Sequence, residues 1–307
     1  MKKVLLWALL CIFVFLCGCS GKPVQEYIPS GVAEYFPNFR NQLRVFGGSG
    51  GEQASITQYA QFVQGNRMQM RFSDDGKIMD CVYTLQEDCV TLTNQYVDGA
   101  RINHLEAQAD LNAEIVLMAP LETGHSWQVK SGGIRTITAV DCEAVTPAGT
   151  FFAIETTTVY PSGRIQRSYY ARQLGLVLYT IEEPGKITVT GKLKEIIHNT
   201  PEQIVCGFFF YSPQTQETLY EKRILQIATN ETFGEVLKQQ LGDAPNGCIA
   251  YSAEIAAPKV MVEAGTATVT LPKAYKNAIA PEDLQGALQA VSYTVMDYTR
   301  CSAVVFR

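Results

Sequence analysis

The middle of the chain alternates short apolar segments with polar turns. Segments rich in Val, Ile, Thr, Tyr and Phe each have the length of one β-strand, and Gly, Pro, Asn and Asp gather between them. They cover residues 58–63, 67–72, 77–85, 90–94, 135–140, 151–159, 166–171 and 175–181. Strands at this spacing, without an amphipathic helix among them, predict an antiparallel β-rich domain over residues 35–197, folded as a curved, half-barrel-like sheet.

The pattern becomes mixed towards the C-terminus. Residues 205–211 form a continuous apolar run that fits a strand, and Thr232 and Glu235 then have the spacing of a helical capping box. An apolar helical face follows, made of Phe233, Val236, Leu237 and Leu241. This spacing predicts a strand and then a helix that packs on a sheet.

A hairpin and a second helix complete this region. Residues 260–262 and 267–271 alternate on either side of a Gly-containing turn, which predicts a hairpin with one buried face. Pro281 then opens a longer helix, with acids in the first turn where the helix dipole favours them, and residues 303–306 fit a last strand. Residues 203–307 are therefore predicted to form a small α+β sandwich, with two helices on one face of a sheet.

The N-terminus has the layout of a secretory signal. Lys2 and Lys3 precede an apolar run over residues 4–16, which is too short for the roughly 20 residues that span a bilayer. The sequence Leu16-Cys17-Gly18-Cys19 resembles a bacterial lipobox. The resemblance implies a signal peptide over residues 1–18, lipidation (palmitate) on Cys19, a tether over residues 19–34 and anchoring on the extracytoplasmic face of the cell membrane.

Charge and cysteine content narrow the class of protein. With 30 acidic and 25 basic residues the net charge is −5, so the clustered basic face typical of nucleic-acid binding is absent from the sequence. Six cysteines follow the lipobox, at Cys81, Cys89, Cys142, Cys206, Cys248 and Cys301. An even number outside the cytoplasm is compatible with disulfides, and the apolar surroundings of several are equally compatible with buried free thiols.

No constellation of residues predicts catalysis, a cofactor or a metal. His104, His125 and His198 are far apart and share no metal-binding spacing, although His125 lies close to Trp127. The glycine-rich run 46–52 lacks the ending of a phosphate-binding loop and fits a flexible hairpin loop, or glycines that let strands bend. Pairs of acids at residues 74–75, 87–88 and 182–183 fall at predicted turns. We therefore expect no enzyme, no cofactor and no metal site.

Two resemblances extend this picture. The segments Val260-Met261-Val262-Glu263-Ala264-Gly265-Thr266-Ala267-Thr268-Val269-Thr270-Leu271 and Ala287-Leu288-Gln289-Ala290-Val291-Ser292-Tyr293-Thr294-Val295 resemble a GerM-type (GerMN) domain of spore-germination and sporulation lipoproteins. That family implies a fold like the ring-building motif and a role in protein interaction. Pro120-Leu121-Glu122-Thr123-Gly124-His125-Ser126-Trp127 with Thr146-Pro147-Ala148-Gly149-Thr150-Phe151 resembles β-rich lipoprotein ectodomains of Gram-positive spore formers, which have no settled biochemical role.

The sequence thus favours a lipid-anchored, non-catalytic envelope protein. Its GerM-like module would bind an envelope protein or a second copy of itself through residues 203–307, in sporulation, germination or envelope maintenance. The aromatic run 208–211 fits either a core strand or an exposed patch for that partner. The alternative is a ligand-binding lipoprotein that holds a lipid, glycan or wall fragment on the curved β-domain, and a wall hydrolase with a scattered carboxylate pair is a third hypothesis.

Overall fold

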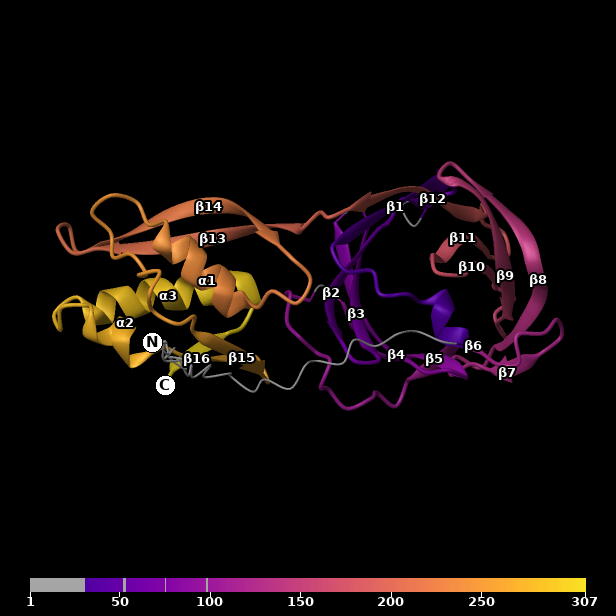
Figure 1. The fold of residues 1–307 in the computed structure, drawn as a ribbon, viewed down its shortest axis with the longest axis horizontal. Helices are drawn as coiled ribbons and strands as arrows, with labels where there is room; N and C mark the ends of the chain where they lie inside the picture. The colour runs from indigo at the N-terminus through magenta and orange to yellow at the C-terminus, as the bar shows by residue number, and fades with distance from the viewer. Residues whose placement is uncertain (1–30, 52–53, 75, 98) are drawn as a thin grey trace, which may run out of the picture.

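The computed structural model describes residues 31–51, 54–74, 76–97 and 99–307, and Figure 1 shows two bodies side by side. The first is a large curled sheet preceded by a short 3-10 helix, η1 (Gly31–Tyr35). The second is a smaller α+β domain. Within the described part of the chain, no helix has both the length and the apolar character needed to cross a membrane. The predicted signal peptide and Cys19 lie outside the described residues.

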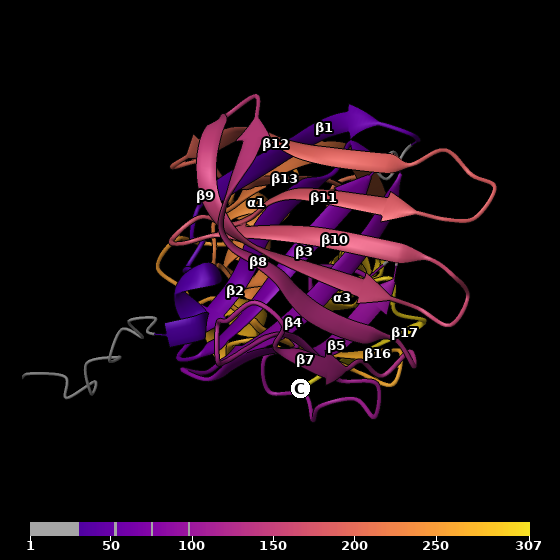
Figure 2. The same ribbon diagram turned by 90° about the vertical axis from the view of Figure 1, so that its right-hand side faces the viewer.

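The large sheet contains twelve strands in the order β6-β5-β4-β3-β2-β1-β12-β11-β10-β9-β8-β7. Their bounds are β1 Gln42–Ser49, β2 Thr57–Gln64, β3 Arg67–Asp74, β4 Lys77–Leu85, β5 Cys89–Val97, β6 Glu114–Met118, β7 Ser126–Gln128, β8 Ile134–Thr146, β9 Gly149–Val159, β10 Ile165–Ala171, β11 Gly175–Glu182 and β12 Val189–His198. Neighbouring strands pair antiparallel throughout. The predicted curved antiparallel sheet is confirmed. Figure 2 shows β8–β12 crossing in front of β2–β5, so the sheet curls into two facing walls.

Strands β2, β3 and β4 are buried on both faces. On β3, Met68 and Met70 belong to the apolar cluster inside the curl, whereas Gln69 and Arg71, which alternate with them, are buried on the outside. The outer side chains are covered by the connection between β5 and β6 and by the C-terminal domain, as the hydrogen bond from Gln69 Nε2 to the Ile102 carbonyl shows (2.8 Å). Because both faces are covered, consecutive residues of these strands are buried, whereas antiparallel sheets commonly leave one face open to solvent.

Residues 46–49 of the glycine-rich run form the last part of strand β1. The β1–β12 register shifts between Val45 and Phe46, as expected for a bulge. At Gly48 a Cβ atom would lie 1.7 Å from the carbonyl oxygen of Thr190 on β12. The interpretation as a flexible hairpin loop is therefore wrong for residues 46–49, and glycine at 48 is required by the close approach of the neighbouring backbone.

The sheet does not close through backbone pairing, because β6 and β7 are its two edges. Side chains bridge this seam instead. Trp127 Nε1 on β7 donates to the Ile115 carbonyl of β6 at 3.0 Å, and Arg135 Nη1 on β8 donates to the same carbonyl at 2.8 Å. Arg135 also pairs with Glu114 at 2.7 Å. These bonds satisfy carbonyl groups of an edge strand that would otherwise be open to another chain.

The C-terminal domain combines two small sheets with helices, in agreement with the predicted α+β class. Strands β13 (Glu202–Ser212) and β14 (Glu217–Ile227) form one sheet, and β15 (Lys259–Glu263), β16 (Thr266–Thr270) and β17 (Ala303–Phe306) form the other. The helices are α1 (Phe233–Gly242), α2 (Lys273–Asn277) and α3 (Leu284–Thr299). The sequence periodicity did not predict that these strands divide into two separate sheets.

Helix α1 begins as the sequence predicts. The Thr232 side chain accepts from the Glu235 N–H at 3.3 Å, and Glu235 accepts from the Thr232 N–H at 2.7 Å. The predicted apolar face is buried in the domain core together with Phe208 and Phe210 of β13. The aromatic run is thus core on one face of the strand, while Phe209 on the other face contacts Tyr220 and Tyr293.

Helix α3 covers the free edge of β13. The N–H groups of Gly207 and Phe209 donate to Asp297 Oδ2 and Thr294 Oγ1, at 2.7 and 2.9 Å. The helix begins at Leu284 rather than at Pro281, because residues 281–283 form a turn that precedes it. Helix α2 and strands β6 and β7 were not predicted, since each is too short to show a clear period.

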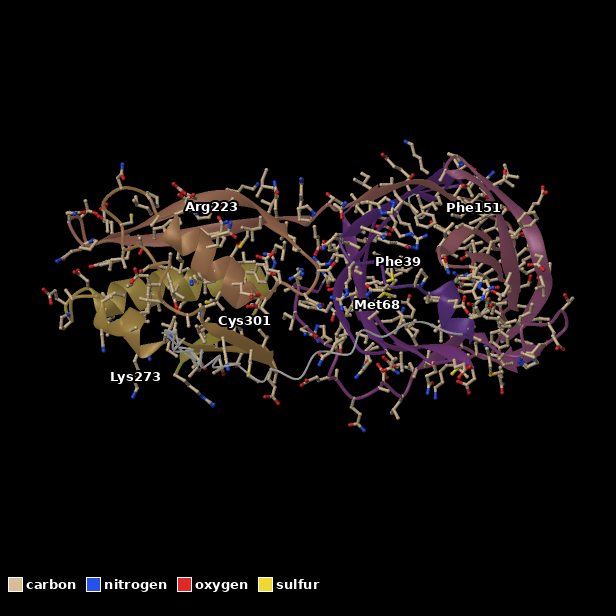
Figure 3. The ribbon with its side chains drawn as sticks, in the orientation of Figure 1. Phe39, Met68, Phe151, Arg223, Lys273 and Cys301 are labelled. Carbon is tan, nitrogen blue, oxygen red and sulfur yellow. The ribbon has the colours of Figure 1, made fainter. Side chains whose placement is uncertain are left out.

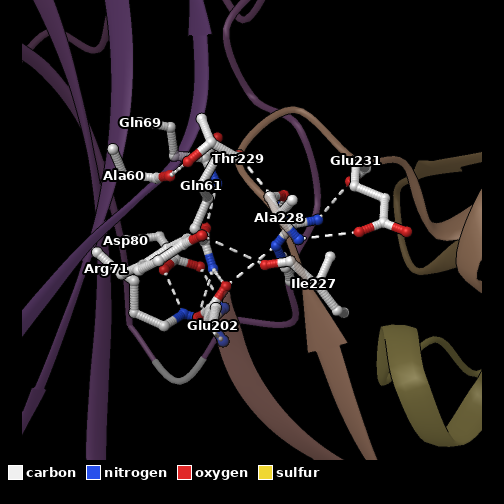
Figure 4. Close-up of polar contacts among 12 residues, drawn as sticks. Ala60, Gln61, Gln69, Arg71, Asp80, Glu202, Ile227, Ala228, Thr229 and Glu231 are labelled. Carbon is white, nitrogen blue, oxygen red and sulfur yellow. Dashed lines mark hydrogen bonds and ion pairs between the residues drawn. The ribbon is translucent and has the colours of Figure 1, made fainter. Parts of the chain in front are cut away.

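A buried cluster of charged side chains joins the two domains (Figure 4). Arg71 binds Asp80 through two hydrogen bonds of 2.8 Å on the outer face of the large sheet. Glu202, at the start of β13, accepts from Arg101 Nε at 3.0 Å and lies 3.4 Å from Arg71 Nη1. Burial raises the pKa of Glu202 against the opposing effect of the two arginines. The domains are thus held together by polar contacts that neither of them satisfies alone.

Backbone contacts reinforce this junction. Asn230, in the loop after β14, donates from Nδ2 to the Val63 carbonyl and accepts from the Val63 N–H, at 2.9 and 2.7 Å. The β2–β3 register shifts between Ala60 and Phe62, which places Gln61 at a bulge. The Gln61 carbonyl accepts from the Asn230 N–H at 2.9 Å and from Arg101 Nη2 at 3.2 Å. The bulge therefore turns one backbone group of the large sheet towards the second domain.

Candidate ligand-binding site

A cavity of about 700 Å³ lies inside the curled sheet. We call this space the lumen. Its walls come from both halves of the sheet, with Met70, Cys81 and Leu92 on one side and Tyr170 and Leu176 on the other. Figure 3 shows Phe39 and Met68 inside the curl. Pockets of this size with mostly apolar walls are typical of sites for small organic ligands.

Helix η1, which includes the last residues of the predicted tether (19–34), closes one end of the lumen together with the residues that follow it. Val32 and Ala33 of η1 are fully buried, and the Val32 N–H donates to the Glu87 carbonyl at 2.8 Å. The ring of Phe36 lies between Tyr83 and Tyr170, with centroid distances of 5.6 and 5.3 Å. This segment forms the floor of the lumen.

Phe39 completes the floor beside the β10–β11 turn. Gly175 in this turn has φ +71°, and a Cβ atom there would lie 2.7 Å from Phe39 Cζ. A side chain at this position would overlap the Phe39 ring in a backbone conformation that favours glycine, so glycine is required.

The opposite end carries polar side chains. Asp74 and Lys77 at the β3–β4 turn, Ser131 before β8 and Arg164 before β10 all line the cavity. Arg164 stacks on Tyr160 at 5.3 Å. Because strands β3, β4 and β10 present these residues at the same end, we take this end as the mouth.

Two polar side chains lie deep in the lumen on neighbouring strands. Arg44 on β1 is 1% exposed and Gln58 on β2 is 2% exposed, and the two are directly paired in the sheet register. Arg44 Nη2 donates to the Leu176 carbonyl at 2.6 Å, and its guanidinium carbon lies 4.4 Å from the Phe39 ring centroid. Burial lowers the pKa of Arg44 to about 9, so the side chain remains charged at neutral pH. No sequence motif marked these residues.

A further hollow of about 840 Å³ lies at the junction of the two domains. It is lined in part by Arg71, Arg101 and Glu202, which already bind one another. Since these charges have their partners, the hollow is a weaker candidate for a ligand than the lumen.

The predicted residues of interest are dispersed in the structure. His125 contacts Trp127 at a centroid distance of 5.7 Å, His104 stacks on Tyr96 at 3.7 Å, and His198 is exposed at the end of β12. Among the described residues, no group of three or more His, Cys, Asp or Glu side chains is placed to hold a metal. The acids at 87–88 and 182–183 lie at strand ends and turns, and Asp74 lies at the end of β3; the acid at position 75 falls outside the described residues.

All six predicted extracytoplasmic cysteines are free thiols. Cys81 lies in the lumen wall, and burial raises its pKa to about 12. Such a thiol stays protonated and behaves as a small apolar side chain.

No protein-family model matches the chain. No curated protein matches it either. One solved structure that resembles it is a candidate exported protein with a YmcC-like fold from Bacteroides fragilis NCTC 9343, at 13% identity over 52% of this chain and 97% of that chain, with a TM-score of 0.32.

A second solved structure is a candidate lipoprotein from Parabacteroides distasonis ATCC 8503, at 12% identity over 53% of this chain and 98% of that chain, with a TM-score of 0.29. Likeness at this level carries no argument about what this chain does.

Proposed function

We propose that this chain is a lipid-anchored, non-catalytic protein of the cell envelope that binds an apolar small molecule in the lumen of its large sheet. The observation that carries the proposal is the cavity of about 700 Å³, with apolar walls, a closed floor and a polar mouth. The envelope location rests on the lipobox-like sequence at Cys19. Of the functions considered from the sequence, the cavity favours ligand binding over assembly alone.

Binding is tested by filling the lumen. Leu92 lines the cavity, so Leu92→Trp is expected to reduce the uptake of an apolar fluorescent probe by at least about tenfold. Val159→Trp, at a position 51% exposed, is the matched control and should bind as the wild type does. Equal probe binding by both variants would rule out the lumen as the site.

Anchoring is tested in cells. Cys19→Ala is expected to abolish labelling with radioactive palmitate and to prevent normal processing, because the acyl acceptor is lost. Unchanged labelling and unchanged membrane retention of the variant would contradict anchoring through this cysteine.

A second role, in protein contact through the GerM-like domain, is favoured by an exposed apolar strip on β13 and β14. Val205 and Ile224 pair in register at 53% and 68% exposure, and Tyr220 is 59% exposed on the same face. A strip of this kind is typical of interaction surfaces. Ile224→Glu should weaken in-cell crosslinking from residues 203–307, whereas Met261→Glu, on the other sheet and 70% exposed, should not. Equal crosslinking of the two variants would argue against this surface.

A further inference from the structure

The lumen contains a charge for which the described residues provide no counterion. The arginines that are buried among the described residues are Arg44, Arg71, Arg101 and Arg135. Three of them have a carboxylate oxygen within reach: Asp80 lies 2.8 Å from Arg71, Glu202 lies 3.0 Å from Arg101 and Glu114 lies 2.7 Å from Arg135. For Arg44, the most buried of the four, residues 31–51, 54–74, 76–97 and 99–307 contain no ion-pair partner.

The guanidinium of Arg44 also has unused donors. Its Nε is buried without a hydrogen-bond partner, and the bond from Nη2 to the Leu176 carbonyl is its sole hydrogen bond within the described part of the chain. The rings of Phe39 and Phe46, at 4.4 and 5.8 Å, offset part of the cost of burying the charge but accept no hydrogen bond in the plane of the guanidinium. Buried charges are normally paired, so a side chain in this state indicates a missing anion.

Gln58 supplies a second donor beside Arg44. The two residues are cross-strand partners on the lumen face, both line the cavity, and within the described residues the Gln58 side chain makes no hydrogen bond. A guanidinium next to a primary amide presents several N–H groups to one small planar anion.

We propose that the lumen binds an amphiphile with a single carboxylate, whose head group lies against Arg44 and Gln58 and whose apolar chain extends towards the mouth. This inference rests on the proposed function. Apolar side chains line the rest of the lumen, with Met70, Leu92 and Val116 among them. Of the two other arginines that line the lumen, Arg164 lies at the mouth, and Arg135 already binds Glu114, Thr158 and the carbonyl of Ile115.

The single unpaired cation at this site favours a head group with one negative charge. One unpaired cation at the closed end balances one monoanion, whereas a dianionic phosphate would leave a second negative charge in an apolar site. A neutral head group would leave Arg44 without a counterion. A monocarboxylate therefore satisfies the site best.

The test compares three ligands of equal chain length, hexadecanoate, hexadecanol and hexadecyl phosphate, by displacement of an apolar fluorescent probe from the full chain. We expect hexadecanoate to bind at least about tenfold more tightly than hexadecanol to the wild type, since a hydrogen bond to a charged group is involved. Arg44→Met should remove that preference while hexadecanol binding is retained, and Gln58→Leu should reduce it. Arg167→Met removes an arginine on the outer face of β10 and should keep the full preference.

The outcomes separate the two proposals. Binding of hexadecanol and hexadecanoate with equal affinity by the wild type, or an unchanged preference in Arg44→Met, would overturn the head-group site and leave the lumen as an apolar site. Tighter binding of hexadecyl phosphate would overturn the monocarboxylate assignment. If none of the three ligands displaces the probe from the lumen, the proposed function itself is overturned.

Discussion

Some buried polar atoms of this protein have hydrogen-bond or ion-pair partners among the described residues, and others do not. At the domain junction Arg71, Asp80, Arg101 and Glu202 satisfy one another. Around the lumen the situation is different, because Arg44 Nε, Asp74 Oδ1 and Arg164 Nε are buried without a partner among the described residues. Satisfied buried groups stabilise a fold, whereas unsatisfied ones lining a cavity indicate a site for an external polar group.

The protonation of His104 is expected to make the stability of the fold depend on pH. It stacks on Tyr96 in the connection that covers the large sheet, and burial lowers its pKa below the ordinary value of 6.5, against a weaker opposing effect of Asp80. The unfolded chain then binds a proton more readily than the folded one, so stability contributed by neutral His104 is lost as the pH falls through 6.5.

His104→Phe should keep the stacking and remove this dependence. Urea denaturation at about pH 7.5 and pH 5.5 measures it, and the variant should lose less stability than the wild type on acidification. An equal loss in both proteins would show that His104 makes no contribution.

Among the elements, strand β1 illustrates how close backbone approach decides which residues are allowed. Gly47 and Gly48 are neighbours on the same strand, yet a Cβ atom at Gly47 would meet only the side chain of Lys194 at 3.7 Å, whereas one at Gly48 would overlap the Thr190 carbonyl. The register shift between Val45 and Phe46 precedes both glycines, and its unpaired residue is Lys194 on β12.

Alanine at each position tests this geometry. Gly48→Ala is expected to lower the free energy of unfolding by about 3 kcal/mol, because β1 and β12 must separate locally. Gly47→Ala, the matched control, should change it by no more than about 0.5 kcal/mol. Thermal or chemical denaturation of both variants gives the comparison, and similar values would contradict the close approach.

In the whole molecule, hydrogen bonds join the two domains. They run from loops and strand ends of the C-terminal domain to the bulged strand β2 of the large sheet. Asn230 is central to this junction, because its side-chain amide makes hydrogen bonds with both the N–H and the carbonyl of Val63, as the backbone of a neighbouring strand would. Its φ of +70° lies in the left-handed region, where asparagine and glycine are tolerated.

Asn230→Gly should retain the backbone shape and remove the two side-chain bonds. The expected loss is about 1–3 kcal/mol of stability, with a widening or splitting of the calorimetric transition as the domains uncouple. Asn199→Gly is the control, because Asn199 also has positive φ, at +52°, but is exposed. A single unchanged transition in Asn230→Gly would show that the junction is held by other contacts.

Local patterns predicted most of the regular elements. Alternation located β2, β3, β4, β9, β10 and β11 to within a few residues, and the spacing of Thr232 and Glu235 located the start of α1. The shortest elements and strand β1 were not predicted, because short elements show no clear period and the glycines of β1 resemble a loop. Arg44 was not recognised, since a lone charged residue between Leu43 and Val45 has no motif.

Local sequence patterns are enough to fix the class of the fold, because strand and helix periods depend on side chains close together along the chain. The sequence also carries the lipobox-like signal, on which the proposed envelope location depends. Three features become visible in the folded chain alone: Arg44 and Gln58 line one lumen, Arg71 and Arg101 bind acidic side chains, and side chains bridge β6 and β7. Burial and missing partners arise from residues far apart in the chain, and no local pattern records them.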